Sequence, residues 1–221
     1  MNKRVLRAMY GPSAIEVILG AALSLALGVV LAALYLVFKP VTVVNALPTL
    51  DKQEEGMVYY IQGTKDAAKG RQLLRKQQLF VEGGSITLTE DELNAWMASS
   101  NGAPKKPAAD PKAPTANELN FRIRNGVLQI GLPCTLPQLG LSESIIVQLQ
   151  GNFVKQDAGF VYVPRTFLIG SLPVQNIPVL PAFLMQKFYA AQQMPDDLVA
   201  AWKKLTNVSI AGDTLQLTMS K

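Results

Sequence analysis

The hydrophobic pattern begins with one long apolar run, VILGAALSLALGVVLAALYLVF, from Val17 to Phe38. The run contains no charged residue, and no polar stripe recurs along it. A helix of this length spans roughly 33 Å at 1.5 Å per residue, and the hydrocarbon core of a bilayer is ~30 Å thick. A helix in the core of a soluble protein would present one polar side to water. The pattern therefore predicts a transmembrane helix over residues 17–38.

The second half of the chain alternates apolar and polar residues, which predicts antiparallel strands. Asn125-Gly126 stands between two such runs, and this dipeptide favours a two-residue hairpin turn of type I′. The resulting register places apolar pairs on one face: Leu119 with Leu132, Phe121 with Ile130, and Ile123 with Leu128. Arg122 and Gln129 meet on the other face. A shift by one residue would mix the two faces, so the turn and the pattern agree.

A second hairpin is predicted around Gly212-Asp213, close to the end of the chain. Its apolar side pairs Ile210 with Leu215, Val208 with Leu217, and Thr206 with Met219. Two further strands are predicted over residues 145–153 and 160–168. We expect all these strands to form one antiparallel sheet, with one face in water and the other face covered by helices.

Two helices near the C-terminus are predicted to cover that sheet. The helix over residues 195–205 is amphipathic, whereas the helix over residues 181–193 is apolar nearly all round. The apolar helix should contact more than the sheet, which makes this region a candidate surface for an apolar ligand or a protein partner. The residues of the candidate surface are Phe183, Leu184, Phe188, Tyr189 and Trp202.

Another helix is predicted over residues 90–99, because Thr89-Glu90-Asp91-Glu92 has the form of a capping box. In a capping box the Thr89 hydroxyl accepts from the backbone N–H of Glu92, and the Glu92 side chain accepts from the backbone N–H of Thr89. Three clustered acids also suggest calcium, but the spacing lacks the loop and the glycine of an EF-hand. We therefore interpret these acids as the start of a helix.

Charged residues around the apolar run predict its orientation in the membrane, and small residues within it predict a face for association. Lys3, Arg4 and Arg7 precede it and only Lys39 follows closely, so the positive-inside rule places the N-terminus in the cytoplasm and the C-terminal part outside. The run is longer than the core of a cleaved signal peptide, so we interpret it as a signal anchor. Small residues recur every four positions and form a candidate face for helix association in lipid. The residues of this face are Gly20, Ser24, Gly28 and Ala32.

These patterns divide the chain into four parts. We expect a cytoplasmic basic tail over residues 1–16, the transmembrane helix over residues 17–38, a connector over residues 39–62 and an extracytoplasmic α+β domain over residues 63–221. The prolines of the connector predict an extended backbone. Within the domain, residues 100–116 are rich in Pro, Ala and Lys and are predicted to form a surface loop.

The composition limits the chemistry that the protein can perform. The chain has no histidine, which removes imidazole as an acid, a base or a metal ligand. Its single cysteine, Cys134, excludes an intrachain disulfide and leaves too few ligands for a transition-metal site. The net charge is +5, of which about +3 follows the apolar run, too little to indicate nucleic-acid binding. No P-loop, dinucleotide fingerprint or Gly-x-Ser-x-Gly elbow occurs, so we predict a non-enzymatic protein without cofactors.

The order of these elements is similar to that of a bacterial group. One N-terminal anchor precedes a strand and the segment LTEDELN at residues 88–94, paired strands follow, and Gly170-Ser171-Leu172-Pro173 precedes an apolar helix. This order resembles the small single-pass envelope proteins of the YpmS-like group, some of which are distantly similar to tubular lipid-binding (TULIP-type) domains. The resemblance covers roughly residues 80–221. It implies a long curved sheet wrapped against a helix, with an apolar seam for acyl chains.

Two functions remain open from the sequence. The small-residue face and the proline-rich loop favour a membrane-anchored interaction or scaffold protein, an accessory component of an envelope or membrane assembly. The apolar helix over residues 181–193 favours the alternative, a membrane-tethered domain that binds lipid or another hydrophobic ligand. The expected partners are membrane lipid and a protein bound through the transmembrane helix or the helix over residues 181–193. We place the interaction function first because it needs no cavity.

Overall fold

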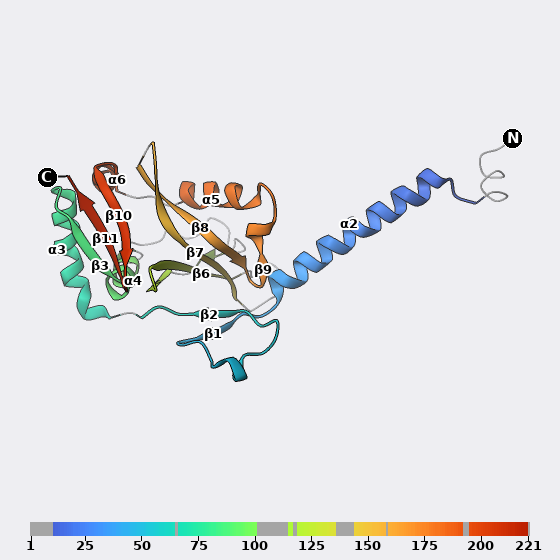
Figure 1. Ribbon diagram of the computed structural model, residues 1–221, viewed down its shortest axis with the longest axis horizontal. Helices are drawn as coiled ribbons and strands as arrows, with labels where there is room; N and C mark the ends of the chain where they lie inside the picture. Colours follow the sequence, from blue (N-terminus) through green and yellow to red (C-terminus); the bar gives the residue numbers. More distant parts are fainter. Residues whose placement is uncertain are drawn as a thin grey trace. The chain divides into compact units, whose positions relative to one another are not determined.

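The computed structural model describes residues 11–64, 66–100, 115–116, 119–135, 144–157, 159–191 and 195–220 (Figure 1). The chain divides into two compact units, Met1–Lys39 and Pro40–Lys221. Residues 1–10 of the predicted basic tail and residues 101–114 of the predicted proline-rich loop lie outside the described residues.

In the described part of the first unit, residues 11–39 contain one helix, α2 (Ala14–Phe38). It begins three residues earlier than predicted, because Ser13 and Glu16 form a capping box ahead of the apolar run. The backbone N–H of Ser13 donates to Glu16 Oε2 at 3.1 Å, and that of Glu16 donates to Ser13 Oγ at 3.3 Å. No residue of α2 is buried. Among the described residues, α2 is the one helix that is long and apolar enough to cross a membrane.

The second unit is an α+β structure, which confirms the predicted class. Its longer strands are β3 (Ile86–Thr89), β5 (Asn120–Arg124), β6 (Val127–Thr135), β7 (Ser144–Gln156), β8 (Gly159–Ile169), β10 (Leu205–Ala211) and β11 (Thr214–Met219). Its short strands are β1 (Thr42–Val44), β2 (Tyr59–Ile61), β4 (Thr115–Ala116) and β9 (Leu172–Pro173). Its α-helices are α3 (Gly70–Val81), α4 (Glu90–Ser100), α5 (Leu180–Ala191) and α6 (Asp196–Lys203). The 3₁₀ turns within its described residues are η1 (Leu50–Lys52), η2 (Ala67–Lys69) and η4 (Val174–Asn176).

The strands that follow β2 form two antiparallel sheets rather than the single sheet that was predicted, and β1 pairs with β2 in parallel. The large sheet has the order β4-β6-β7-β8-β9, with β5 also paired to β6, and the small sheet has the order β10-β11-β3. β11 therefore pairs with β3 from a distant part of the chain, with Leu215 opposite Leu88 and Leu217 opposite Ile86. Alternation marks both of these segments as strands, but it does not specify which strand becomes the neighbour of which.

Both predicted hairpins are present in the structure. In the first, Phe121 lies opposite Ile130 and Ile123 opposite Leu128, as predicted, although β5 starts at Asn120 and leaves the expected Leu119–Leu132 pair outside the ladder. Its turn residues have the positive φ angles that type I′ requires, 52° at Asn125 and 73° at Gly126.

The second hairpin departs from its predicted register at one end. The pairs of Ile210 with Leu215 and of Val208 with Leu217 are as predicted, but Met219 lies opposite Leu205 instead of Thr206. A β-bulge between Leu205 and Asn207 shifts the ladder by one residue. The bulge buries Leu205 and leaves Thr206 exposed, so the apolar side chain takes the inner position.

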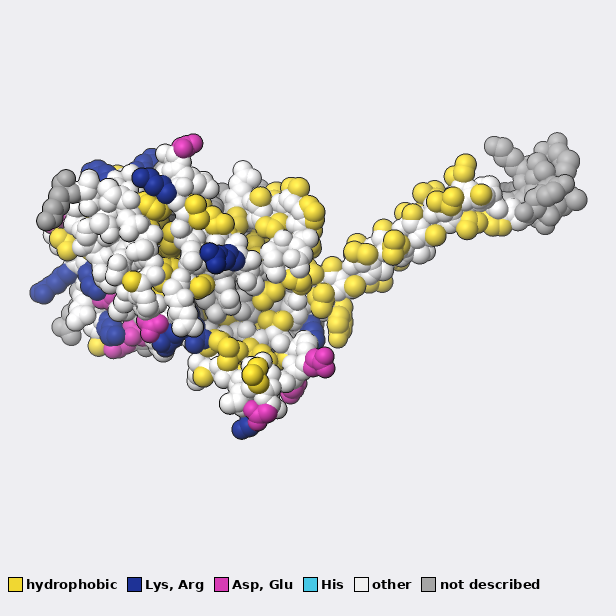
Figure 2. Space-filling model, viewed as in Figure 1, with side chains coloured by type: hydrophobic (Ala, Val, Ile, Leu, Met, Phe, Trp, Pro, Cys, Tyr) yellow, Lys and Arg dark blue, Asp and Glu magenta, His cyan; other side chains and the backbone are white. Residues whose placement is uncertain are grey.

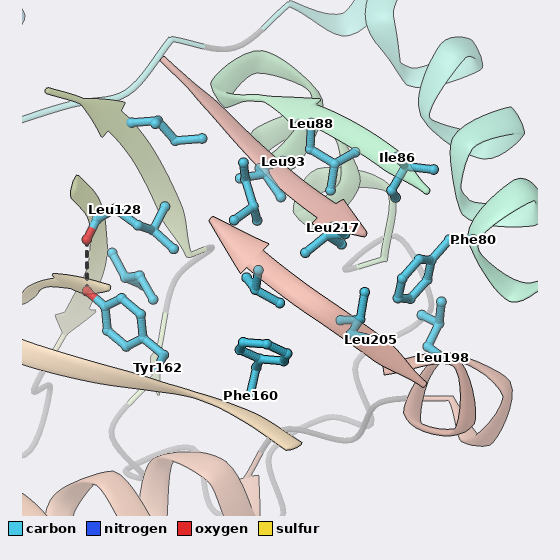
Figure 3. Packing of buried hydrophobic residues seen from close by; sticks show 14 of the residues in the cluster. Phe80, Ile86, Leu88, Leu93, Leu128, Phe160, Tyr162, Leu198, Leu205 and Leu217 are labelled. Atoms are coloured by element: carbon cyan, nitrogen blue, oxygen red, sulfur yellow. Dashed lines mark hydrogen bonds between the residues drawn. The ribbon is translucent and has the colours of Figure 1, made fainter. Parts of the chain in front are cut away.

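The main hydrophobic core joins one face of the large sheet to the small sheet and the helices. Figure 3 shows Leu88 and Leu217 of the small sheet, Phe80 of α3 and Leu198 of α6 in this cluster. The hydroxyl of Tyr162 donates to the carbonyl of Leu128 at 2.8 Å inside the cluster. We call this side of the large sheet the apolar face; its buried residues include Ile123, Leu128, Ile130, Leu149 and Phe167.

The opposite side of the large sheet, which we call the polar face, was predicted to be in water, and this prediction is wrong. Its residues include Asn120, Arg122, Gln129, Gly131 and Gln148, which share two cross-strand rows. Gln129 and Gln148 are buried. Residues 40–62, which the sequence predicted to be a connector, lie over this face, with β1 and β2 on the side of the sheet away from α5 (Figure 1). We call residues 40–62 the strap.

Candidate functional site

The capping box predicted at the start of α4 is confirmed. The backbone N–H of Thr89 donates to Glu92 Oε2 at 2.8 Å, and that of Glu92 lies 3.4 Å from Thr89 Oγ1. Glu92 is buried, and its carboxylate lies 2.6 Å from Lys76 Nζ. A buried charge is costly unless it is paired, so the lysine of α3 is what allows this carboxylate inside.

Two other polar residues of α4 bind the edge of β5. Asn94 accepts from the backbone N–H of Phe121 at 2.7 Å and donates to its carbonyl at 2.8 Å, as a neighbouring strand would. Glu90 accepts from the backbone N–H of Ile123 at 3.0 Å. Four residues of helix rise roughly 6 Å and two residues of strand roughly 6.6 Å, so side chains at these spacings match. The helix thus covers a strand edge that pairs with nothing else among the described strands.

The same two side chains hold the segment that follows the strap. The backbone N–H of Thr64 donates to Glu90 Oε1 at 2.6 Å, and its carbonyl accepts from Asn94 Nδ2 at 2.7 Å. The backbone N–H of Gly63 donates to Asn120 Oδ1 at 2.7 Å. A Cβ at Gly63 would collide with the carbonyl oxygen of Phe121, so a glycine is needed for this close approach.

Asp91, the remaining acid of the cluster, forms an ion pair at the surface. Its carboxylate accepts from Lys69 Nζ at 2.8 Å and from the Thr64 hydroxyl at 2.6 Å. The hydrogen bond from Lys69, and then that from Thr64, lower the pKa of Asp91, while the hydrogen bond to Asp91 raises the pKa of Lys69. Glu90, Asp91 and Glu92 therefore each bind groups of the protein itself. The described residues contain no group of three or more His, Cys, Asp or Glu that could hold a metal ion.

The strap is held on the polar face by Tyr60 and by a hydrogen bond to the carbonyl of Ile61. Within the strap, all of which the structure describes, Tyr60 is the one buried side chain, at 2% exposure. Its ring lies where a side chain at Gly131 would be, and its hydroxyl donates to Asn120 Oδ1 at 2.8 Å. Next to it, Gln129 Nε2 donates to the carbonyl of Ile61 at 3.0 Å. Burial, and then the charge of Glu90, raise the pKa of Tyr60 to about 12.

The structure separates the residues of the predicted apolar surface. Phe183 is 51% exposed on α5, whereas Leu184 packs against the core. Trp202 also packs against the core, with its ring centroid 5.7 Å from that of Phe153, and its indole N–H donates to the carbonyl of Phe160 at 2.9 Å. Phe188 and Tyr189 fall within α5, but their side chains lie outside the described part of the structure. Exposed apolar side chains are visible over α5 in Figure 2.

The predicted small-residue face of α2 is fully accessible in this chain. Gly20, Ser24, Gly28 and Ala32 are all exposed. A Cβ added at Gly20 or at Gly28 would meet nothing within 4 Å. Side chains this small would let a second helix approach the α2 backbone closely.

Sequence reasoning missed the residues that hold the strap and the segment that follows it. Tyr60, Asn94, Asn120 and Gly131 act together although they come from four separate elements. One signal was present, because Asn94 follows Glu90 by four residues and therefore shares its side of the helix. Comparison of the chain with protein-family models, with curated proteins and with solved structures found no match.

Proposed function

We propose that the protein is a membrane-anchored interaction or scaffold protein, an accessory component of an envelope or membrane assembly. The observation that carries this proposal is α2, a 25-residue apolar helix with no buried residue, in a chain whose remaining residues form a separate folded unit. An apolar helix without a buried residue is unfavourable in water and favourable in lipid. The charge distribution around it orients the N-terminus toward the cytoplasm and the folded unit toward the periplasm or the cell exterior.

The use of the acidic residues supports a non-enzymatic role. Carboxylates that serve in catalysis must reach a substrate or a reacting proton. Glu90 and Glu92 are buried and bound to backbone groups or a lysine, and Asp91 is bound to Lys69 and Thr64. These bonds account for the clustered acids of the LTEDELN segment as parts of the fold.

Two surfaces are suited to partners in this proposal. The small-residue face of α2 suits a second transmembrane helix, and the exposed side of α5 around Phe183 suits a protein surface. No charged residue occurs between Arg165 and Lys187, so this side of α5 is poor in groups that would favour water over an apolar partner.

Lipid binding is the second candidate function, favoured by the same exposed Phe183 and by the resemblance to tubular lipid-binding domains. A photoactivatable crosslinker placed at Phe183 in native membranes separates the two candidates. Adducts with protein support the interaction function, adducts with acyl lipid support the alternative, and adducts with neither count against both. The same crosslinker at Leu74, an exposed position on α3, is the matched control.

The membrane anchor is tested with the intact chain. Membrane fractions should retain the protein after alkaline carbonate extraction, and a reporter fused after Lys221 should be active on the outer side. Recovery of the intact chain in the cytosol would contradict the proposal. Association through α2 is tested by replacing Gly28 with Ile, which should reduce crosslinked oligomers, with Ala22→Ile on the opposite side of the helix as the control.

A further inference from the structure

The strap is weakly connected to the rest of the second unit. β1 and β2 form a separate two-stranded parallel sheet, and no ladder joins them to another described strand. Two large apolar side chains between these two strands, Leu47 and Leu50, are exposed. Tyr60 is the one side chain of the strap that is buried, and the hydrogen bond from Gln129 to the carbonyl of Ile61 adds a second, weaker contact.

The surface beneath the strap is better suited to water than to permanent burial. Gln148 lies directly opposite Gly131, beside the Tyr60 ring, and is 1% exposed, yet its Nε2 has no hydrogen-bond partner. Nη1 of Arg122 on the same face is also buried without a partner. Unpaired buried polar groups disfavour the state that buries them and lose this penalty when water reaches them.

The attachment of the chain changes character at the end of the strap. Gly63 and Thr64 are bound by Asn120, Glu90 and Asn94 through short hydrogen bonds that also belong to the α4–β5 contact. Loss of these bonds would disrupt the packing of α4, whereas loss of the Tyr60 contact would leave α4 and β5 intact. Opening that starts in the strap therefore stops at Gly63.

We propose that the strap is a detachable tether, which docks by seating Tyr60 over Gly131 and separates from the polar face while the remainder of the unit stays folded. Detachment exposes the row of Asn120, Gly131 and Gln148. Extended backbone rises roughly 3.3 Å per residue, so the open strap spans up to about 75 Å. The longer distance that the open strap spans matters only if the proposed membrane anchor is correct, because only an anchored chain needs to bridge it. The detachment itself does not depend on the anchor.

Hydrogen exchange on the full chain in detergent micelles tests whether the strap opens independently of the large sheet, and the tyrosine variants below test whether that opening is coupled to the seat of Tyr60. The backbone N–H of Thr42 donates to the carbonyl of Val58, and that of Gln62 donates to the carbonyl of Val44, both at 3.0 Å. These amides should exchange at least 100-fold faster than the amide of Leu149 in the core of the large sheet. Equal protection of the two regions would overturn the proposal, because the strap would then open only on global unfolding.

Adjacent tyrosines provide a matched pair of variants. Tyr60→Ala should accelerate exchange in the strap by at least 10-fold and leave Leu149 unchanged. Tyr59→Ala should change strap exchange by less than threefold, since the Tyr59 hydroxyl accepts from Glu54 within the strap itself. If Tyr60→Ala accelerates exchange equally in the strap and in β7, the strap is part of the core and the proposal fails.

A substitution at Gly131, beneath the Tyr60 ring, provides a second test of detachment. A methyl group at Gly131 would occupy the position of the Tyr60 ring, so Gly131→Ala should also open the strap. Combined with Tyr60→Ala it should add nothing further, because the two groups compete for one space. If Gly131→Ala does not fold, the comparison of Tyr60→Ala with Tyr59→Ala still tests the proposal. A failure of the membrane-anchor tests would remove the gain in reach but would leave these exchange results interpretable.

Discussion

The two faces of the large sheet are buried in different ways. The apolar face is covered by the small sheet and the helices through a continuous set of buried side chains. The polar face is covered by the strap through one buried tyrosine and a few hydrogen bonds. Burial of apolar area is strong and non-directional, whereas a hydrogen bond contributes little net free energy because water offers the same bond. The comparison indicates that the apolar face stabilises the fold and that the polar face carries a detachable cover.

The largest expected effect lies on the apolar face. Ile123 is 0% exposed, and its replacement by Ala should lower the free energy of unfolding by about 2–5 kcal/mol through lost burial and the cavity left behind. Gln129→Ala on the polar face should lower it by less than about 1 kcal/mol. Denaturant unfolding followed by tryptophan fluorescence measures both. Equal losses would contradict the distinction between the faces.

The contact between α4 and β5 should rank second. Asn94→Ala leaves the backbone N–H and carbonyl of Phe121 without their side-chain partner, which should lower the free energy of unfolding by about 2–3 kcal/mol. Asn207→Ala, at an exposed position on β10, serves as the control and should change it by less than about 0.5 kcal/mol. If both variants unfold at the same denaturant concentration, Asn94 does not hold the edge of β5.

The polar face should respond to alkaline pH through Tyr60. Its pKa is about 12 when docked against an ordinary value of 10.0, so the docked state holds the phenolic proton more tightly. Docking should therefore be nearly constant below about pH 9 and weaken as pH rises, by about 50-fold, or roughly 2.3 kcal/mol, at pH 12. Hydrogen exchange of the strap relative to β7 measures the change. Tyr60→Phe should abolish the difference in pH dependence between the two regions, and a persistent difference would assign it to another group.

The smallest effect on the free energy of unfolding is expected for an exposed ion pair that lies on neither face of the large sheet. Arg124 Nη1 lies 2.9 Å from Asp213 Oδ2 between the two hairpin turns, and both side chains are more than half exposed. Exposed ion pairs contribute little, so Arg124→Ala should change the free energy of unfolding by less than about 1 kcal/mol. Thermal unfolding at low and high salt checks this value. A loss as large as that of Ile123→Ala would show that surface charge, and not the apolar face, sets the stability.

Whether a feature could be predicted from the sequence depends on how far apart its interacting residues lie along the chain. The Asn125-Gly126 turn, most of the register of both hairpins and the capping box at Thr89 were predictable, because each depends on residues a few positions apart. The bulge at Leu205 was not, since the choice between Leu205 and Thr206 depends on what fills the core.

By itself, the sequence determined the apolar helix, the hairpins and the α+β class, because turn chemistry and hydrophobic period act locally. Only the tertiary structure decided that β11 pairs with β3, that Asn94 and Glu90 bind the edge of β5, and that the strap lies on the polar face. Those contacts join segments that are far apart in the chain. Their partners are chosen by shape and by unpaired backbone groups, such as the edge of β5 and the space over Gly131. The pattern of hydrophobic and polar positions contains no information on shape or on unpaired backbone groups.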